Sequence, residues 1–281
     1  YGTHANLKEA FLAFVERIPF YGLAVLCLDH PDVQDLLPRV RHRHVTYGLS
    51  PQADYSAKDI SFHGLETHFT TLRKGQSLGQ FAVRMPGQHN VLNCLAAIAV
   101  ADELEVPLDV CKEALATFHG VARRFTVVSE VAGIQLVDDY GHHPAEVIAT
   151  LEAARRAYSG RVLVAFQPHR YTRTHLLFDE FTRAFNRADA VFLTNIYPAG
   201  EAPIAGVTSA HLAEGLRSHG HHSAVFIEDR NKLVEALANE AKPGDVVIAL
   251  GAGDINKILP QIEAQLKFRL AGAKGGGHGG Q

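Results

Sequence analysis

Hydrophobic and polar residues follow two different rhythms along the chain. In the first part, apolar residues recur at helical spacing near both ends, whereas between about residues 43 and 85 they alternate with polar ones, as in half-buried strands. Gly75 and Gly79 are expected in a loop between the last two strands. The pattern predicts helices over 5–17, 31–37, 90–104 and 108–118, and strands over 24–28, 44–47, 55–62, 65–72 and 81–85.

A predicted hinge over 118–125 separates this part from the second. Gly120 is expected to end the preceding helix in a left-handed cap. Continuous apolar runs then alternate with helical segments, which is typical of βαβ units whose parallel strands are covered on both faces. Strands are predicted over 133–137, 162–166, 190–194, 224–227 and 246–250, with helices near 145–157, 176–187, 209–218, 231–240 and 255–267.

The composition of the chain argues against several classes of function. The net charge of −3 provides no basic field for nucleic acid or an anionic lipid surface. No apolar run approaches the ~20 residues of a membrane span, and no secretory signal is visible. The three cysteines lie in apolar stretches and are expected to be reduced core residues of a cytosolic protein. Tyr1 stands where an initiator Met would, so we expect a chain cut from a longer protein.

The stretch from Val137 to Pro144 carries two carboxylates, a phenol and two imidazoles between a predicted strand and a predicted helix. Pro144 suits the first helical turn. Open α/β sheets bind their ligands in loops at the carboxyl ends of strands, so we expect a functional site here. The histidine pairs 142/143 and 221/222 lack metal-ligand spacing, and no dedicated zinc site is expected.

Arginine pairs mark two further places. Arg170 and Arg173 follow the strand at 162–166 and could clamp a phosphate or a carboxylate, because guanidinium forks match both geometries. A solvated helix start is the alternative. In the hinge, Arg123 and Arg124 are adjacent and should point apart, so at most one is expected to meet a phosphate. A plain surface pair is equally compatible with that sequence.

Two motifs contain residues suited to nucleotides. Asn90 and Asn93 share a helix face, and a carboxamide offers the donor and acceptor that an adenine edge requires. From the residues alone, a helix cap by Asn90 is the favoured interpretation. The Gly251-Ala-Gly253 turn lacks the third glycine of a dinucleotide fingerprint, and a tight turn with close helix packing is favoured.

Six motifs in order resemble the Mur ligase family, from Tyr1 to about Leu266. They are Gly-x-His-Asn-x-x-Asn, Arg-Arg-Phe, Asp-Asp-Tyr-Gly-His-His-Pro, Phe-Gln-Pro-His-Arg-Tyr-x-Arg-Thr, Tyr-Pro-Ala-Gly-Glu-Ala-Pro (197–203) and Gly-Ala-Gly-Asp-Ile. The resemblance implies an incomplete central ATPase-type α/β domain over 1–120 and a Rossmann-like βαβ domain with a mostly parallel sheet over 121–270. Residues 271–281 are Gly-rich and expected to form a disordered tail.

The resemblance also implies an activity. Within the family, the motifs are most similar to those of the ligases that use ATP to join L-alanine to the lactyl carboxylate of UDP-N-acetylmuramate, a cytoplasmic step of peptidoglycan precursor synthesis. A sibling ligase that recycles a preformed peptide is one alternative. We expect Asp-Asp-Phe-Ala-His-His-Pro in that sibling, so Tyr140-Gly141 favours alanine. A non-catalytic nucleotide-binding fragment is the other alternative.

Roles for single residues follow from the motif match. ATP, Mg²⁺, UDP-N-acetylmuramate and L-alanine are the implied ligands, with neither nucleic acid nor membrane as a partner. The chain contains no Gly-Lys-Ser/Thr phosphate loop, and the Mg²⁺ ligands of the family are expected upstream, so this chain alone is expected to be inactive. The implied assignments are Asn90 and Asn93 at adenine, His89 supporting their turn, Arg124 at the phosphates, Asp139 at the ribose, and Tyr140, His142, Arg170 and Arg173 at the amino-acid and acyl end.

Overall fold

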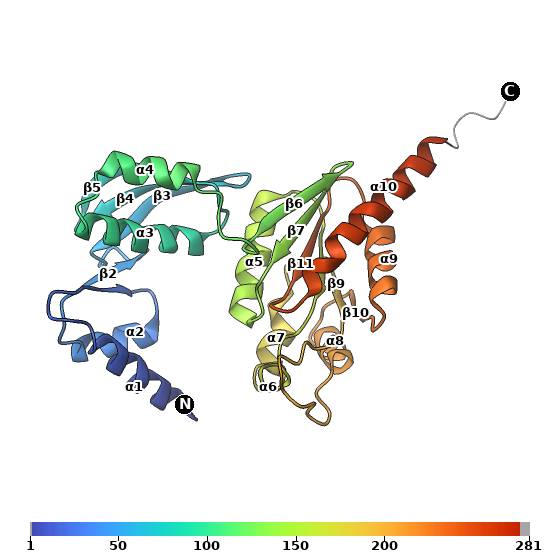
Figure 1. Cartoon of the computed structure of the whole chain (residues 1–281), viewed down its shortest axis with the longest axis horizontal. Coiled ribbons are helices and arrows are strands. Elements are labelled where there is room, and N and C mark those ends of the chain that lie inside the picture. Colours follow the sequence, from blue (N-terminus) through green and yellow to red (C-terminus); the bar gives the residue numbers. More distant parts are fainter. Residues whose placement is uncertain (1, 276–281) are drawn as a thin grey trace. The chain divides into compact units, whose positions relative to one another are not determined.

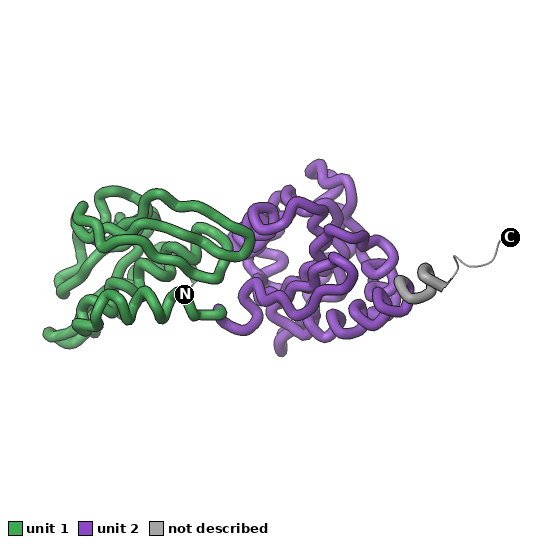
Figure 2. The backbone as a smooth tube through the Cα atoms, turned by 90° about the horizontal axis from the view of Figure 1, so that it is seen from above, with its two compact units in different colours: residues 1–119 green, residues 120–281 purple. Residues whose placement is uncertain are grey.

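The computed structural model describes residues 2–275, and side-chain surroundings are described as far as residue 269. The chain forms two compact units, residues 1–119 and 120–281 (Figure 2). Within the described residues, every helix is too short or too polar to span a lipid bilayer.

The first unit contains a five-stranded mixed sheet in the order β1-β2-β3-β4-β5 (Figure 1). The pairs β1·β2 and β2·β3 are parallel, whereas β3·β4 and β4·β5 are antiparallel. Its elements are α1 (His4–Val15), β1 (Ala24–Cys27), α2 (Pro31–Leu36), η1 (Leu37–Arg39), β2 (His44–Gly48), β3 (Tyr55–His63), β4 (Glu66–Arg73), β5 (Gln76–Val83), α3 (Gln88–Glu103) and α4 (Leu108–Thr117).

One hydrophobic cluster holds this unit together. Phe69 of β4 and Phe81 of β5 stack with ring centroids 5.9 Å apart, and the buried side chains of Val91 and Ile98 from α3 lie in the same cluster. Helix α1 contributes nothing to it and has no buried residue; Phe14, for example, remains 72% exposed. The core of the first unit is therefore made by α3, α4 and the sheet.

Two predictions for the first unit are wrong. Gly79 lies inside β5 and not in a loop, with a φ of +98° beside a shift in the register between β4 and β5. Glycine is favoured at such an irregularity. Because it has no side chain, it interrupts the apolar–polar alternation that predicts a strand. Gly120 does not cap α4, because the helix ends at Thr117 and the next residue, Phe118, is already extended.

The second unit contains a six-stranded sheet in the order β10-β9-β8-β11-β7-β6 (Figure 1). Every neighbouring pair is parallel except β6·β7, which confirms the predicted mostly parallel βαβ fold. Its elements are β6 (Thr126–Val131), β7 (Ile134–Asp139), α5 (Pro144–Ala157), β8 (Val162–Phe166), α6 (Tyr171–Leu176), α7 (Phe178–Ala184), β9 (Ala190–Leu193), α8 (Ser209–Ser218), β10 (Ala224–Phe226), α9 (Arg230–Glu240), β11 (Val246–Leu250), η2 (Ile255–Ile258) and α10 (Leu259–Gly275).

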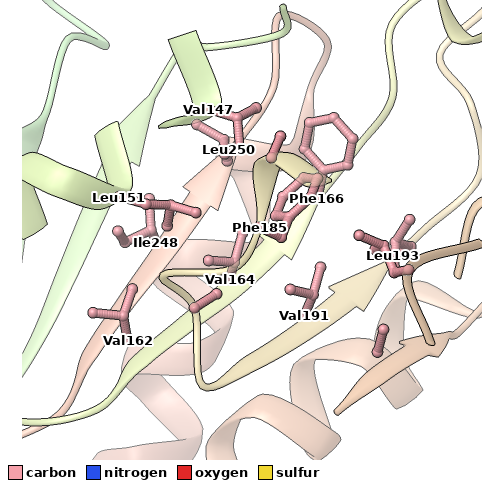
Figure 3. Close-up of a cluster of buried hydrophobic side chains, with 14 of the residues drawn as sticks. Val147, Leu151, Val162, Val164, Phe166, Phe185, Val191, Leu193, Ile248 and Leu250 are labelled. Carbon is pink, nitrogen blue, oxygen red and sulfur yellow. The ribbon is translucent and has the colours of Figure 1, made fainter. Parts of the chain in front are cut away.

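Both faces of this sheet are covered. Helices α5, α7 and α8 pack on one face, where Ile248 and Leu250 of β11 join Leu151 and Phe166 in one cluster (Figure 3). Helices α9 and α10 pack on the other face, where Val247 of the same strand lies in a second cluster. Because alternate residues of a strand point to opposite faces, a strand between two apolar layers needs an uninterrupted apolar sequence.

Several expectations for the second unit also need correction. Strand β6 was not predicted, because an edge strand with polar residues carries no continuous apolar run. The helix predicted over 176–187 corresponds to the shorter α7, α6 before it was not predicted, and the helix predicted over 255–267 begins with η2. Residues 271–275 belong to α10 and contradict the expected tail, whereas 276–281 lie outside the described residues.

Candidate functional site

The candidate site lies at the carboxyl edge of the second sheet, where β7, β8 and β11 end as neighbours. Backbone hydrogen bonds tie the following loops together: Gly251 N donates to Asp139 O (3.0 Å), and Gln167 N donates to Leu250 O (3.0 Å). The motif that begins at Val137 and the motif that begins at Phe166 therefore lie at one edge of the sheet, as the rule for parallel sheets predicts.

The buried carboxylate of Asp139 makes hydrogen bonds within the fold. Asp139 is the last residue of β7 and only 4% exposed. One carboxylate oxygen accepts from Gly141 N (2.7 Å) and the other from Phe125 N (2.8 Å). Burial raises the pKa of Asp139, and the two amides partly offset this effect. This geometry favours a structural role over the expected contact with a ribose.

Arg123 and Arg124 point in different directions, as expected for adjacent residues. Arg123 donates to the carbonyl oxygens of Gly251 (2.7 Å) and Gly253 (3.2 Å) and pairs with buried Asp138 (3.4 Å). Arg124 is about half exposed and pairs with Glu146 (3.2 Å). Arg123 therefore fastens the loop after β11, and Arg124 is the member of the pair that solvent can reach.

Glu146 orders the turn between β7 and α5. His143 is the N-cap of α5, and Glu146 accepts from the backbone N–H groups of His142 (2.9 Å) and His143 (3.0 Å) in a capping box. His142 Nδ1 donates to Tyr140 O (2.9 Å), which leaves Nε2 as an acceptor in the neutral ring. Sequence reasoning overlooked Glu146, although its position three residues after an N-cap is the signal for such a box.

Four rings form a continuous array beside this turn. The centroids of Tyr140 and His142 are 5.3 Å apart, those of His142 and His169 are 5.7 Å apart, and His169 stacks on Tyr197 at 5.5 Å. Burial, followed by the charge of Arg173, lowers the pKa of His169, so this imidazole is neutral at pH 7. Both His169 and Tyr197 belong to the family-like motifs, but no role was predicted for Tyr197.

The two arginines after β8 differ in their partners. Arg170 lies 3.7 Å from a carboxylate oxygen of Glu201. Arg173 donates to the carbonyl oxygen and to Nδ1 of His169, both at 3.3 Å, and among the described residues no carboxylate lies within 4.0 Å of it. Burial and the charge of Arg170 lower the pKa of Arg173, which still remains a cation.

The glycines of the loop after β11 pack closely against neighbouring loops and, at Gly251, against Ile255 of η2, whose Cγ2 would lie 3.4 Å from an added Cβ. A Cβ on Gly253 would lie 2.3 Å from Gln167 Oε1 and 2.8 Å from the ring of Tyr197, so only glycine fits. Gln167 exchanges two hydrogen bonds with Asp254, at 3.1 and 3.0 Å, and Arg230 pairs with the same aspartate at 2.9 Å.

The predicted nucleotide residues of the first unit lie in the first turns of α3. Asn90 Nδ2 donates to Pro86 O (2.8 Å), and Asn93 Nδ2 lies 3.4 Å from Asn90 Oδ1, so the two amides share a face as predicted. The favoured helix cap is wrong, because Gly87 occupies the N-cap position. His89 is exposed on the same helix.

Family models match most of the chain. The Mur ligase middle domain matches residues 1–101, and the Mur ligase glutamate ligase domain matches residues 123–253. The chain therefore belongs to the Mur ligase family.

Individual relatives point to one branch of that family. The chain is 65% identical, over 272 residues, to the UDP-N-acetylmuramate–L-alanine ligase of Sorangium cellulosum, covering 96% of this chain and 58% of that protein. It is 54% identical to the ligase of the same name from Myxococcus xanthus, covering 93% and 56%. The solved UDP-N-acetylmuramate–alanine ligase of Thermotoga maritima superposes with a TM-score of 0.75 at 26% identity, covering 95% and 56%. The chain thus spans a little over half the length of these relatives.

Proposed function

We propose that these residues belong to a ligase that uses ATP to join L-alanine to the lactyl carboxylate of UDP-N-acetylmuramate. The observation that carries the proposal is the unequal pairing of four arginines at one sheet edge. Arg123, Arg124 and Arg170 each have a carboxylate within 4.0 Å, whereas Arg173 has none among the described residues. A partly buried guanidinium without an anion is suited to receive one from a substrate.

The chemistry of the proposed reaction suits this arrangement. ATP transfers its γ-phosphoryl group to the lactyl carboxylate and leaves as ADP. The amine of alanine then attacks the acyl phosphate, loses a proton and releases phosphate. Negative charge builds on the phosphoryl group and on the tetrahedral intermediate, so fixed cations lower the barrier. We assign Arg173 and Arg170 to the alanine carboxylate and the charged intermediate. The free Nε2 of His142 can accept from the amine, and Tyr140 completes this end of the site.

The ATP end of the site is assigned by motif. We propose that Arg124 contacts the phosphates and that Asn90 and Asn93 contact adenine, with His89 supporting their turn. In this proposal Asp139 shapes the turn from within. No three His, Cys, Asp or Glu side chains gather as a metal site in the described part of the chain. The implied Mg²⁺ is therefore not assigned to these residues. We also propose that the enzyme acts in the cytoplasm, because its substrates are ATP and UDP-N-acetylmuramate.

The test uses the full-length protein, meaning a polypeptide that contains these 281 residues and has the length of the relatives. Phosphate release is measured with ATP and UDP-N-acetylmuramate, and L-alanine is compared with a preformed cell-wall peptide as the amine. We expect release that depends on L-alanine. A preference for the peptide would support the recycling ligase, and ATP binding without any turnover would support the non-catalytic alternative.

A further inference from the structure

The loop after β9 contacts the loop after β8, which carries Arg170, at several points. The proposed mechanism assigns no role to the loop after β9. Tyr197 N donates to Pro168 O (2.8 Å), and Arg170 N donates to Tyr197 O (2.8 Å). The ring of Tyr197 stacks on His169 with an interplanar angle of 9°. The loop after β9 therefore follows the loop after β8 from Pro168 to Arg170, like a short added strand.

Arg170 has a backbone conformation that side-chain-bearing residues rarely adopt. Its φ is +73° and its ψ is 136°, at the position immediately before α6. In addition to the bond from Arg170 N, its carbonyl accepts from Thr174 N (3.2 Å) and from Thr174 Oγ1 (2.9 Å). A strained residue persists only when its surroundings hold it, and such residues cluster at functional sites.

Glu201 supplies the next contact. One of its carboxylate oxygens accepts from Thr172 N (3.0 Å), and the other accepts from Thr172 Oγ1 (2.7 Å). The latter oxygen is also the one near the guanidinium of Arg170. The N-cap of α6 makes no side-chain hydrogen bond of its own, so Glu201, 29 positions from Thr172, accepts from an N–H group of the first turn. The amide of Thr172 lowers the pKa of Glu201, which is therefore an anion at pH 7.

We propose that Glu201 is a positioning residue that presents Arg170 to the carboxylate of the amino-acid substrate. Its carboxylate fixes the first turn of α6 on one side and orients the Arg170 side chain on the other. The distance of 3.7 Å is too long for a hydrogen bond, so Glu201 orients the guanidinium and leaves its N–H groups available. This inference rests on the proposed function, because it takes the carboxylate of alanine as the anion.

The kinetic test compares Glu201→Gln with Glu214→Gln in the full-length protein. Glu214 is an exposed residue of α8 and serves as the matched control. We expect Glu201→Gln to raise the KM for L-alanine about tenfold and to change the KM for ATP less than about twofold, as for a residue that acts on one substrate. Glu201→Asp keeps the charge and should retain more of the affinity. An unchanged alanine KM in Glu201→Gln would overturn the inference.

A double-mutant cycle with Arg170→Ala separates positioning from general stability. If Glu201 acts through Arg170, Glu201→Gln should change the alanine KM less than about twofold when Arg170 is already alanine. If the two substitutions instead raise the alanine KM by independent factors that multiply, Glu201 acts elsewhere and the inference is overturned. If Glu201→Gln fails to fold, the same cycle is run with Glu201→Asp.

A spectroscopic arm keeps this inference separate from the proposed function. The Nε–H signal of Arg170 is identified in NMR spectra of the full-length protein by its loss in Arg170→Ala. We expect Glu201→Gln to shift or broaden that signal and Glu214→Gln to leave it unchanged, whether or not the protein turns over. An undisturbed signal would overturn the inference about Glu201. A disturbed signal without alanine-dependent turnover would instead overturn the proposed function, and with it alanine as the anion, while Glu201 would still position Arg170.

Discussion

The two sheets of the protein are covered in different ways. The parallel sheet of the second unit lies between two apolar clusters, and its strand β11 contributes Ile248 to one (Figure 3) and Val247 to the other. The mixed sheet of the first unit has one cluster, and α1 leaves Phe11 and Phe14 at 58% and 72% exposure. The second unit therefore has the more complete core, and we infer that it is the more stable of the two.

The candidate sites differ in the same way. In the second unit, charged side chains at three strand ends are fixed by hydrogen bonds from loops that rest on a two-sided core. In the first unit, the predicted site consists of neutral amides on one helix turn. We expect transition-state stabilisation from the former and modest nucleotide affinity from the latter.

The largest expected effect comes from cutting a large side chain out of each core. Phe166 is fully buried and touches the rings of Phe181 and Phe185, with centroids at 5.6 and 4.9 Å. Phe166→Ala should cost about 3–5 kcal/mol because it removes apolar burial and leaves a cavity. Hydrogen exchange measured by mass spectrometry should rise across 120–269 and stay unchanged across 2–119. Phe69→Ala should give the converse, and equal changes in both units would contradict their independence.

The next effect concerns the arginine without a carboxylate partner. In the full-length protein, Arg173→Ala should lower kcat/KM for L-alanine by about 2–4 kcal/mol in transition-state terms, because a fixed cation at the developing charge is lost. Arg173→Lys keeps the charge but not the fork and should recover only part of the loss. Arg183→Ala, at an exposed position of α7, is the control. If Arg173→Ala behaves like this control, Arg173 belongs to a solvated helix start.

A smaller effect is expected at the amide pair of the first unit. Asn93→Ala should raise the KM for ATP by a factor that corresponds to about 1 kcal/mol, the usual value of one neutral hydrogen bond. The KM for L-alanine should not change, because that substrate is assigned to the second unit. A large loss of kcat with an unchanged KM for ATP would count against the adenine assignment and would weaken the contrast between the two sites.

The smallest effect is a pH dependence within the second unit. His221 is buried, and its Nδ1 accepts from Ser223 N (3.3 Å). Burial lowers the pKa of His221 below its ordinary value of 6.5. The unfolded chain therefore binds the proton first, and this contribution to stability is complete above pH 6.5 and is lost as the pH falls through the folded pKa.

To check this expectation, hydrogen exchange in the second unit is measured over a urea titration at pH 7.5 and at pH 5.0. The free energy of unfolding is then compared between the two pH values. His221→Gln has no ring to protonate and should lose less stability on acidification than the wild type does. An equal loss in both proteins would mean that His221 does not titrate in this range.

Local patterns in the sequence were sufficient for most of the second unit. Continuous apolar runs marked the parallel strands, and the rule that ligands bind at their carboxyl ends brought the motifs around Tyr140 and Arg170 together. Strand β6, the strand position of Gly79 and the short helix α6 were not predicted, because edge strands, bulges and short helices leave weak periodicity.

The sequence by itself determined which chemistry-bearing side chains lie at the sheet edge, since local apolar runs mark the parallel strands and the carboxyl ends of such strands meet at one edge. Only the tertiary structure decided their tasks. It turned Asp139 inward, committed Arg123 to the carbonyls of Gly251 and Gly253, and placed Glu201 beside α6. The contacts of Arg123 with Gly251 and of Glu201 with Thr172 are hydrogen bonds between segments far apart in the chain. Such bonds satisfy buried polar groups wherever the fold brings a partner, and no local spacing encodes them.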